Sequence, residues 1–152
     1  MSGIPNRDAI NTLVLRLLSN LTAGPGAFTH TTTDGELVIQ LPAHALRPAV
    51  SCLIDEIGIL HLTTITGEDL PPHIALRYHF WHHYGFTLEI ELPRDRPVVA
   101  SLVDLVPGVA LYEREVHDML GVLFEGHPDL RPLLLPDEWQ GPPPLRKEDT
   151  HG

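Results

Sequence analysis

Two carboxylic acids and a histidine near the end of the chain are the residues best suited to chemistry. Glu115 and Asp118 lie three positions apart in residues 109–120 (VALYEREVHDML), and His127 follows soon after. Neighbouring carboxylates on a helix can serve as general acid and general base, and histidine titrates near neutral pH. These residues therefore suggest a free-standing acid/base enzyme. The alternative is a solvated helix face or an ion-pair network to a partner, because no phosphate loop, cofactor fingerprint or nucleophile–base arrangement accompanies them.

Histidines raise a second possibility, a metal centre. His79, His82 and His83 are close in the sequence, but on a strand His79 and His83 would share a face that His82 does not. Because the sequence has no HExxH motif and no cysteine pair, we predict no metal site. The single cysteine, Cys52, excludes an internal disulfide and a self-contained cysteine-ligated iron–sulfur cluster, and its apolar neighbours indicate a small buried side chain.

The helix predicted over residues 109–120 would position the acids. Glu113 and His117 are four residues apart, as are Arg114 and Asp118, so each pair can meet on the helix surface. The apolar face of this helix would consist of Val109, Tyr112, Val116, Met119 and Leu120.

Residues 121–131 (GVLFEGHPDLR) contain glycines and a His-Pro step, so we expect them to leave the helix and form turns. Pro128 restricts His127 to an extended conformation, and Asp129 can accept hydrogen bonds from nearby backbone N–H groups. Arg131 then has a fixed position from which its guanidinium could bind a carboxylate in this chain or in a neighbour.

Residues 132–149 (PLLLPDEWQGPPPLRKED) are so rich in proline that they can neither continue a helix nor complete a sheet. We expect this extended tail to be ordered only against a partner, and Arg146 and Lys147 near its end to contact an acidic patch of that partner. A purely solvated tail would seldom keep its apolar side chains, which are Leu133, Leu134, Leu135, Trp139 and Leu145.

Taken in order, these residues resemble the pattern of one family. The pattern consists of Glu113-Arg114-Glu115, Asp118-Met119-Leu120-Gly121, Phe124, Gly126-His127-Pro128-Asp129-Leu130-Arg131 and Pro144-Leu145-Arg146-Lys147. It is similar to that of the 30-kDa subunit, or C-type subunit, of respiratory NADH:quinone oxidoreductase (complex I) and of its relatives in membrane-bound hydrogenase-type complexes. Weaker similarity upstream, from Arg77 to Pro107, extends the resemblance to about half of the chain.

The resemblance implies a non-catalytic peripheral-arm subunit of an ion-translocating complex that passes electrons from NADH to quinone. Such a subunit packs against the D-type subunit, which resembles a hydrogenase large subunit and lines the quinone site, and near the B-type subunit. It binds no cofactor, because FMN, the iron–sulfur clusters and quinone belong to partner subunits. It is held on the cytoplasmic side of the cell membrane through the complex. Assembly and interface geometry, with no catalytic role, are then assigned to Glu113, Arg114, Glu115, Asp118, Gly121, His127, Pro128, Asp129, Arg131, Arg146 and Lys147.

The sequence departs from the family pattern in places. Leu111-Tyr112 stands where a tryptophan usually precedes the ERE motif, Pro132 where a second arginine usually follows Arg131, and Leu120 where an aromatic residue often precedes the glycine. These departures leave open the equivalent subunit of a membrane-bound hydrogenase, a formate hydrogenlyase or a ferredoxin-dependent complex. A scaffold or binding module unrelated to respiration is a further alternative.

Composition limits the classes of function. The chain has 152 residues, enough for one domain with a real core, and its formal net charge of −10 argues against nucleic acid as a partner. No apolar run approaches the roughly 20 residues that span a bilayer, and no secretory signal precedes residue 8, so we expect a cytoplasmic protein.

The elements upstream of residue 109 follow from hydrophobic spacing and turn residues. Residues 8–21 and 47–57 are predicted helices, and residues 27–33 and 36–41 a hairpin with Asp34-Gly35 as a type I′ turn. Residues 59–65 are a predicted strand. Residues 74–80 and 86–92 alternate apolar and polar side chains, which predicts an antiparallel hairpin in which Arg77 pairs with Glu89 or Glu91.

These elements predict an α+β fold, in which helices lie on one face of a mixed or antiparallel sheet that has one solvated face. We expect one α+β domain over residues 1–131, followed by the extended, proline-rich C-terminal tail over residues 132–152.

Overall fold

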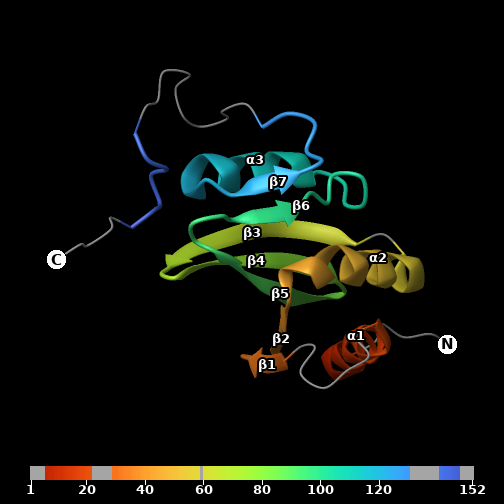
Figure 1. Cartoon of the computed structure of the whole chain (residues 1–152). Helices are drawn as coiled ribbons and strands as arrows, with labels where there is room; N and C mark the ends of the chain where they lie inside the picture. Colours follow the sequence, from red (N-terminus) through yellow and green to blue (C-terminus); the bar gives the residue numbers. More distant parts are fainter. Residues whose placement is uncertain (1–5, 22–28, 59, 131–140, 148–152) are drawn as a thin grey trace.

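The computed structural model describes residues 6–21, 29–58, 60–130 and 141–147. Two helices and a hairpin come first, and a third helix follows three long strands (Figure 1). The elements are α1 (Arg7–Leu21), β1 (Thr29–Thr33), β2 (Glu36–Leu41), the 3-10 turn η1 (Ala43–Ala45), α2 (Leu46–Ile57), β3 (His61–Leu70), β4 (His73–His82), β5 (Tyr84–Pro93), β6 (Val98–Ala100), α3 (Val109–Leu120) and β7 (Leu123–Glu125).

The main sheet has five strands in the order β1-β2-β5-β4-β3. Strands β2 and β5 are parallel, and every other neighbouring pair is antiparallel, so the predicted mixed sheet is confirmed. The sequence does not predict the second, parallel sheet of β6 and β7, since it indicates turns over residues 121–131, where β7 lies. Strands of three residues are too short to show an alternating pattern, which explains why the sequence does not reveal them.

Local signals define the N-terminal elements. The side chain of Asn6 accepts a hydrogen bond from the backbone N–H of Ala9 at 2.8 Å and caps α1. Asp34 and Gly35 both have positive φ angles, 52° and 82°, as the type I′ turn between β1 and β2 requires. The helix and the hairpin are therefore confirmed.

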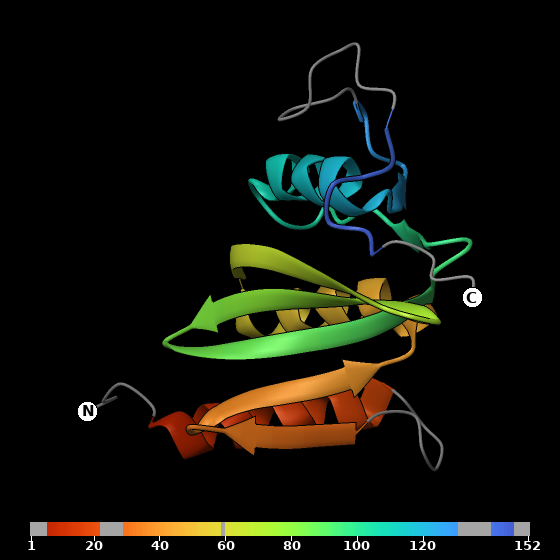
Figure 2. The same ribbon diagram turned by 90° about the vertical axis from the view of Figure 1, so that its left-hand side faces the viewer.

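The core lies between α1 and α2 and one face of the main sheet. Figure 2 shows both helices behind the sheet, whose other face is open. Alternate residues of β4 and β5, such as Tyr78, Phe80, Phe86 and Leu88, are at most 1% exposed on the helix side. Burial of each such side chain contributes about 1.5–3 kcal/mol, so the period-two pattern determines which face the helices cover.

Helix α3 packs beside β3, and a glycine makes the close approach possible. A Cβ atom built on Gly67 would lie 2.3 Å from Cδ1 of Leu120 and 3.2 Å from Cδ2 of Leu76. Because Leu76 belongs to the apolar face of the sheet, α3 covers the β3 end of that same face. In the described part of the chain, no helix is both long and hydrophobic enough to cross a membrane.

We expect Gly67→Ala to lower the free energy of unfolding by about 1–3 kcal/mol, because the added methyl group overlaps buried Leu120. Urea denaturation measures this change. In a Leu120→Ala background the substitution should cost clearly less, since the clashing atom is gone. Equal costs in the two backgrounds would show that α3 does not lie against Gly67.

Candidate functional site: the surroundings of α3

Helix α3 carries most of the residues singled out in the sequence, and its bounds, Val109–Leu120, are those predicted. Gly108 and Gly121 flank it with φ angles of 78° and 75°, a conformation that favours glycine at both positions. Of the predicted apolar face, Tyr112 and Met119 are only partly buried. The fully buried positions are Val109, Glu113, Val116, Asp118 and Leu120.

The burial of Glu113 corrects the prediction of a surface pair with His117. The Glu113 carboxylate is 0% exposed and accepts hydrogen bonds from the Ser101 hydroxyl at 2.5 Å and from the Leu102 backbone N–H at 3.0 Å. His117 instead donates from Nδ1 to the Val122 carbonyl at 2.8 Å. Each side chain therefore anchors a different backbone segment next to the helix.

The buried carboxylate has a clear electrostatic signature. Burial raises the pKa of Glu113, although the bonds from Ser101 and Leu102 and the nearby His127 oppose this shift. Burial also raises the pKa of Tyr78, and the charge of Glu113 adds to that effect. The hydroxyl of Ser101 also accepts a hydrogen bond from the Val103 N–H at 3.1 Å, so Glu113 and Ser101 together hold the turn before α3.

His127 anchors the GHPD segment at the start of α3. Its Nε2–H donates to the Ala110 carbonyl at 3.0 Å, while its Nδ1 accepts from the Asp129 N–H at 2.9 Å. Asp118 lies eight residues after Ala110 in the same helix, which corresponds to a rise of about 12 Å. The structure therefore does not bring His127 together with Glu115 and Asp118 as an acid/base set.

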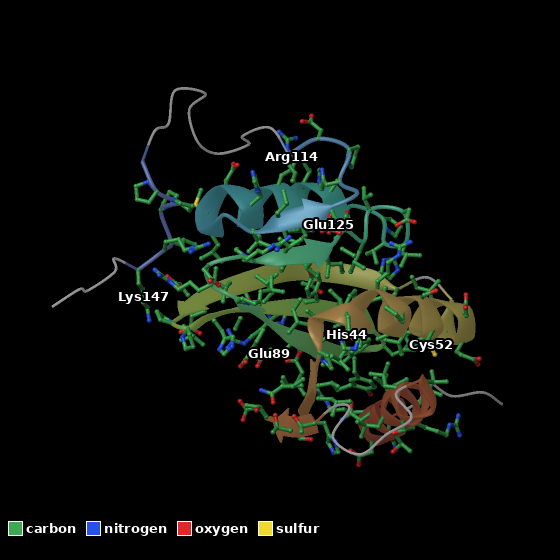
Figure 3. All side chains as sticks on the ribbon, viewed as in Figure 1. His44, Cys52, Glu89, Arg114, Glu125 and Lys147 are labelled. Carbon is green, nitrogen blue, oxygen red and sulfur yellow. The ribbon has the colours of Figure 1, made fainter. Side chains whose placement is uncertain are left out.

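The outer side of α3 presents both apolar and charged residues. Leu111 is 57% exposed, and Glu115 is exposed one helical turn further along. The sequence placed Asp118 on the helix surface, but its side chain is only 5% exposed, so that predicted position is wrong. Arg114 is half-buried and is labelled in Figure 3. Arg131 lies outside the described residues.

The C-terminal end of α3 is covered by the chain's own tail. Arg146 donates from Nε to the Leu120 carbonyl at 2.6 Å and from Nη1 to the Arg94 carbonyl at 3.1 Å. The backbone N–H of Leu145 donates to the Met119 carbonyl at 2.8 Å. The last carbonyls of a helix have no partner within it, and a cation there opposes the helix dipole, so Arg146 acts as a C-terminal cap.

A buried ion pair holds this tail segment against the sheet. Arg94 Nε lies 2.8 Å from Asp69 Oδ1, and Asp69 Oδ2 accepts from the Lys147 N–H at 2.7 Å. Arg94 also donates to the Lys147 carbonyl at 2.6 Å. Burial of Asp69 opposes ionisation, but the bonds and charges of Arg94, Lys147 and Arg146 together lower its pKa. We call Asp69, Arg94, Arg146 and Lys147 the C-terminal clasp.

The clasp corrects the prediction that residues 132–149 are ordered only against a partner. Residues 141–147 are bound to the domain itself, while residues 131–140 lie outside the described part of the structure. Gly121 contributes to this contact, because a Cβ there would lie 3.1 Å from Pro143 Cγ. Asp69 and Arg94 were not singled out in the sequence, where nothing local connects them to a tail more than fifty residues away.

His79 of β4 and Cys52 of α2 were also singled out in the sequence. His79 lies between the hydroxyls of Thr66 and Thr87, at 2.9 and 3.0 Å, and burial lowers its pKa. Cys52 is half-buried, and burial raises the pKa of its thiol. Within the described ranges, no group of three or more His, Cys, Asp or Glu side chains is arranged to hold a metal ion.

Comparisons with known proteins give a consistent picture. The family model for the respiratory-chain NADH dehydrogenase, 30 Kd subunit, matches residues 39–151. The C-type subunit of the NADH-quinone oxidoreductase of Moorella thermoacetica is 36% identical over 72% of this chain and 77% of that protein. The C-type subunit of the F(420)H(2) dehydrogenase of Methanosarcina mazei is 39% identical over 58% of this chain and 59% of that protein.

A longer relative is the C/D subunit of the NADH-quinone oxidoreductase of Methylococcus capsulatus, which is 34% identical over 95% of this chain but only 27% of that protein. The chain thus spans less than two thirds of both this relative and the Methanosarcina one.

Solved structures share the fold. A chain of the membrane-bound sulfane sulfur reductase, an archaeal respiratory membrane complex, has a TM-score of 0.75 at 24% identity, covering 90% of this chain and 82% of that one. A trypsin-resistant fragment of Nqo5 has a TM-score of 0.65 at 23% identity, covering 82% of this chain and all of the fragment. At these identities the likeness concerns the fold alone.

We expect the stability advantage of the wild type over Glu113→Gln to shrink as pH rises. The pKa of Glu113 is higher in the folded than in the unfolded chain, so the folded state holds this proton more tightly. This stabilisation is fully present at a pH below the pKa of Glu113 in the unfolded chain, about 4.3. It is lost as the pH rises through the pKa of Glu113 in the folded chain. Urea denaturation between pH 4 and 7 measures it, with exposed Glu115→Gln as control. A stability advantage of the wild type that grows with pH would contradict the raised pKa of Glu113.

We expect Asp69→Asn to destabilise the protein by roughly 3 kcal/mol, because it leaves the Arg94 charge without its buried partner. Hydrogen exchange should show loss of protection at the Leu145 and Lys147 amides, since the clasp opens before the domain unfolds. Asp95→Asn, at an exposed position beside Arg94, should change neither quantity. Unchanged protection in Asp69→Asn would exclude the clasp.

Proposed function

The chain belongs to the respiratory-chain NADH dehydrogenase 30-kDa subunit family, and from this premise we propose that it is a non-catalytic peripheral-arm subunit of an ion-translocating NADH:quinone oxidoreductase-type complex. In that role it contributes assembly and interface geometry, while partner subunits carry FMN, the iron–sulfur clusters and quinone. It sits on the cytoplasmic side of the membrane, held there through the complex.

One observation carries the non-catalytic assignment: two polar side chains of the family pattern, Glu113 and His127, are hydrogen-bonded to groups of the chain itself. Glu113 binds Ser101 and Leu102, and both ring nitrogens of His127 are bonded to backbone groups. A general acid or base must reach a proton of the substrate, and these side chains face their own domain instead. The pattern thus supports a rigid docking element.

The D-type subunit is the proposed principal partner, with the B-type subunit close by and the quinone site beyond. One relative is named as a C/D subunit, and fusion in one polypeptide favours two parts that lie together. The outer side of α3 and the neighbouring β7 provide the surface, since Leu111 and Leu123 are 57% and 46% exposed. Large apolar side chains left on a rigid surface are typical of an interface.

The remaining residues of the family pattern extend this surface. We propose that residues 1–131 form the docking domain and that the tail from 132 to 152 continues the contact, starting from the clasp. Arg131 and Lys147 would then bind acidic groups of the partner. Gly121 and Pro128 determine the backbone path between helix, turn and tail.

A related complex with another electron donor is the second candidate. The relative from Methanosarcina mazei is named as a component of F(420)H(2) dehydrogenase and is 39% identical over the matched region. The departures at Leu111, Leu120 and Pro132 favour neither donor. In each case the chain would serve as the equivalent subunit.

Leu111→Asp should weaken association with the D-type subunit at least tenfold, about 1.4 kcal/mol, because it places a charge in an apolar contact. Affinity purification of the tagged full-length chain from its native membranes measures the recovered partner. Thr32→Asp, an exposed change on β1, is the control. Circular dichroism should be unchanged for both. A wild-type chain that purifies as a monomer with turnover of its own would refute the subunit assignment.

A further inference from the structure

The open face of the main sheet consists of rows of side chains that cross the strands. One row runs through Arg77, Glu89, Gln40 and Thr29, linked by bonds of 2.7, 2.8 and 2.9 Å, and Figure 3 labels Glu89 within it. It also contains the cross-strand pair of Arg77 and Glu89, one of the two pairings that the sequence left open. Side chains locked in this way are already satisfied and offer little to a ligand.

The next row includes a second linked set. His79 lies between the hydroxyls of Thr66 and Thr87, and Thr87 donates to Glu36 at 3.4 Å. This distance is long, so Glu36 is only weakly bound. Within the described residues, the Glu36 carboxylate makes no ion pair.

The third row contains a gap. Trp81 of β4 pairs with Gly85 of β5, and Glu36 of β2 lies beside Gly85, one position before the paired Leu37 and Phe86. A Cβ on Gly85 would be 3.1 Å from Glu36 Oε1 and 3.7 Å from Trp81 Cε3. Because Gly85 has no side chain, Glu36 and Trp81 approach its backbone from two sides. They border, with Gly85, the hollow above it, and we call this place the Gly85 notch.

A glycine in the middle of a strand costs stability, and it often marks a place where another group approaches the backbone. The notch opens into a hollow of about 340 Å³, which Thr63, Thr64 and Arg7 also line. Trp81 is 52% exposed at its border, although tryptophan is a costly residue to leave in water. The gap thus combines an aromatic surface with a carboxylate that forms no ion pair with the described part of the chain.

We propose that the Gly85 notch binds an arginine side chain of a partner protein. A guanidinium is planar, can stack on an indole and can donate two parallel hydrogen bonds to a carboxylate. Trp81 and Glu36 provide these two partners on either side of the gap. The net charge of −10 favours a cationic ligand as well. This inference rests on the proposed function in one respect only, which is that the partner protein is another subunit of the same complex.

Arg7 is a cation of the same chain beside the notch. Its guanidinium lies over the Tyr84 ring, 5.2 Å from the centroid, and it makes no ion pair in the described part of the structure. It therefore does not neutralise Glu36, but its charge disfavours a second cation nearby. Removal of Arg7 should strengthen arginine binding, whereas removal of Glu36 should weaken it.

The first test titrates the full chain with N-acetyl-arginine amide and follows the Trp81 indole N–H and the Gly85 amide by NMR. We expect saturable shifts at both groups, and much smaller ones with N-acetyl-citrulline amide, which has the same shape without the charge. Glu36→Gln should weaken binding at least threefold, Arg7→Gln should strengthen it, and Glu125→Gln on β7 (Figure 3) should leave it unchanged.

Gly85→Ala provides a steric test, because its methyl group would occupy the floor of the notch. The nearest atom is the end of the flexible Glu36 side chain, so the variant should fold normally and lose the arginine-induced shifts. Equal shifts from the citrulline compound, or arginine binding that persists in both Glu36→Gln and Gly85→Ala, would refute the proposal that the Gly85 notch binds arginine.

The second test places a photo-cross-linking amino acid at Thr63, which lines the hollow, in the tagged chain and irradiates the assembled complex. We expect a cross-link to an arginine-containing peptide of another subunit. A complex that contains the D-type subunit but gives no such cross-link would refute the notch and leave the proposed function intact. If no D-type subunit co-purifies, the proposed function is refuted. The NMR titration then decides by itself whether the Gly85 notch binds arginine.

Discussion

The buried carboxylate of Glu113, on α3, determines how the second half of the molecule is arranged. Glu113 has no access to water, so its charge must be satisfied by donors within the fold. The Ser101 hydroxyl and the Leu102 N–H meet this requirement, and they can do so only if the turn after β6 lies against the helix. The position of the small sheet of β6 and β7 therefore depends on one side chain that looks, in the sequence, like an ordinary surface acid.

The two ends of α3 are closed by segments that follow it in the chain. His127 binds the Ala110 carbonyl near the start, and Arg146 binds the Leu120 carbonyl at the end. Helix ends are otherwise weak points, because their backbone groups lack partners within the helix. With both ends held by the domain itself, the helix is a rigid element that exposes Leu111 and Glu115 on its outer side. Such a rigidly held helix suits the docking role proposed above.

The proposed contacts lie in different parts of the fold. In Figure 1, α3 and β7 lie beside β3 at one edge of the main sheet, whereas β1 and β2 lie at the other. The α3 surface is apolar at Leu111 and Leu123, while the open sheet face consists of linked polar rows with one interruption. Surfaces of such different chemistry suit different partners, so the two proposed contacts do not compete for the same face.

Much of the fold was determined by short-range features of the sequence. The spacing of apolar residues located the three α-helices of the described part of the chain, and Asp34-Gly35 located a hairpin. The alternation in residues 74–92 predicted a second hairpin that pairs Arg77 with Glu89 or Glu91, and the structure selects Glu89. The family pattern was equally visible, because its residues are close together in the chain. These signals act over a few positions, where backbone geometry alone decides which side chains share a face.

Only the tertiary structure decided which of these residues face inward. Glu113 and Asp118 are buried because other segments cover them, and Arg146 caps α3 of its own chain through contacts with Leu120 and Arg94 that span 26 and 52 positions. The parallel pairing of β2 with β5 and the gap at Gly85 likewise join distant segments. No local sequence pattern encodes such neighbours. A polar side chain has the same position in the helical or strand repeat whether it bonds to water or to a backbone group from a distant segment.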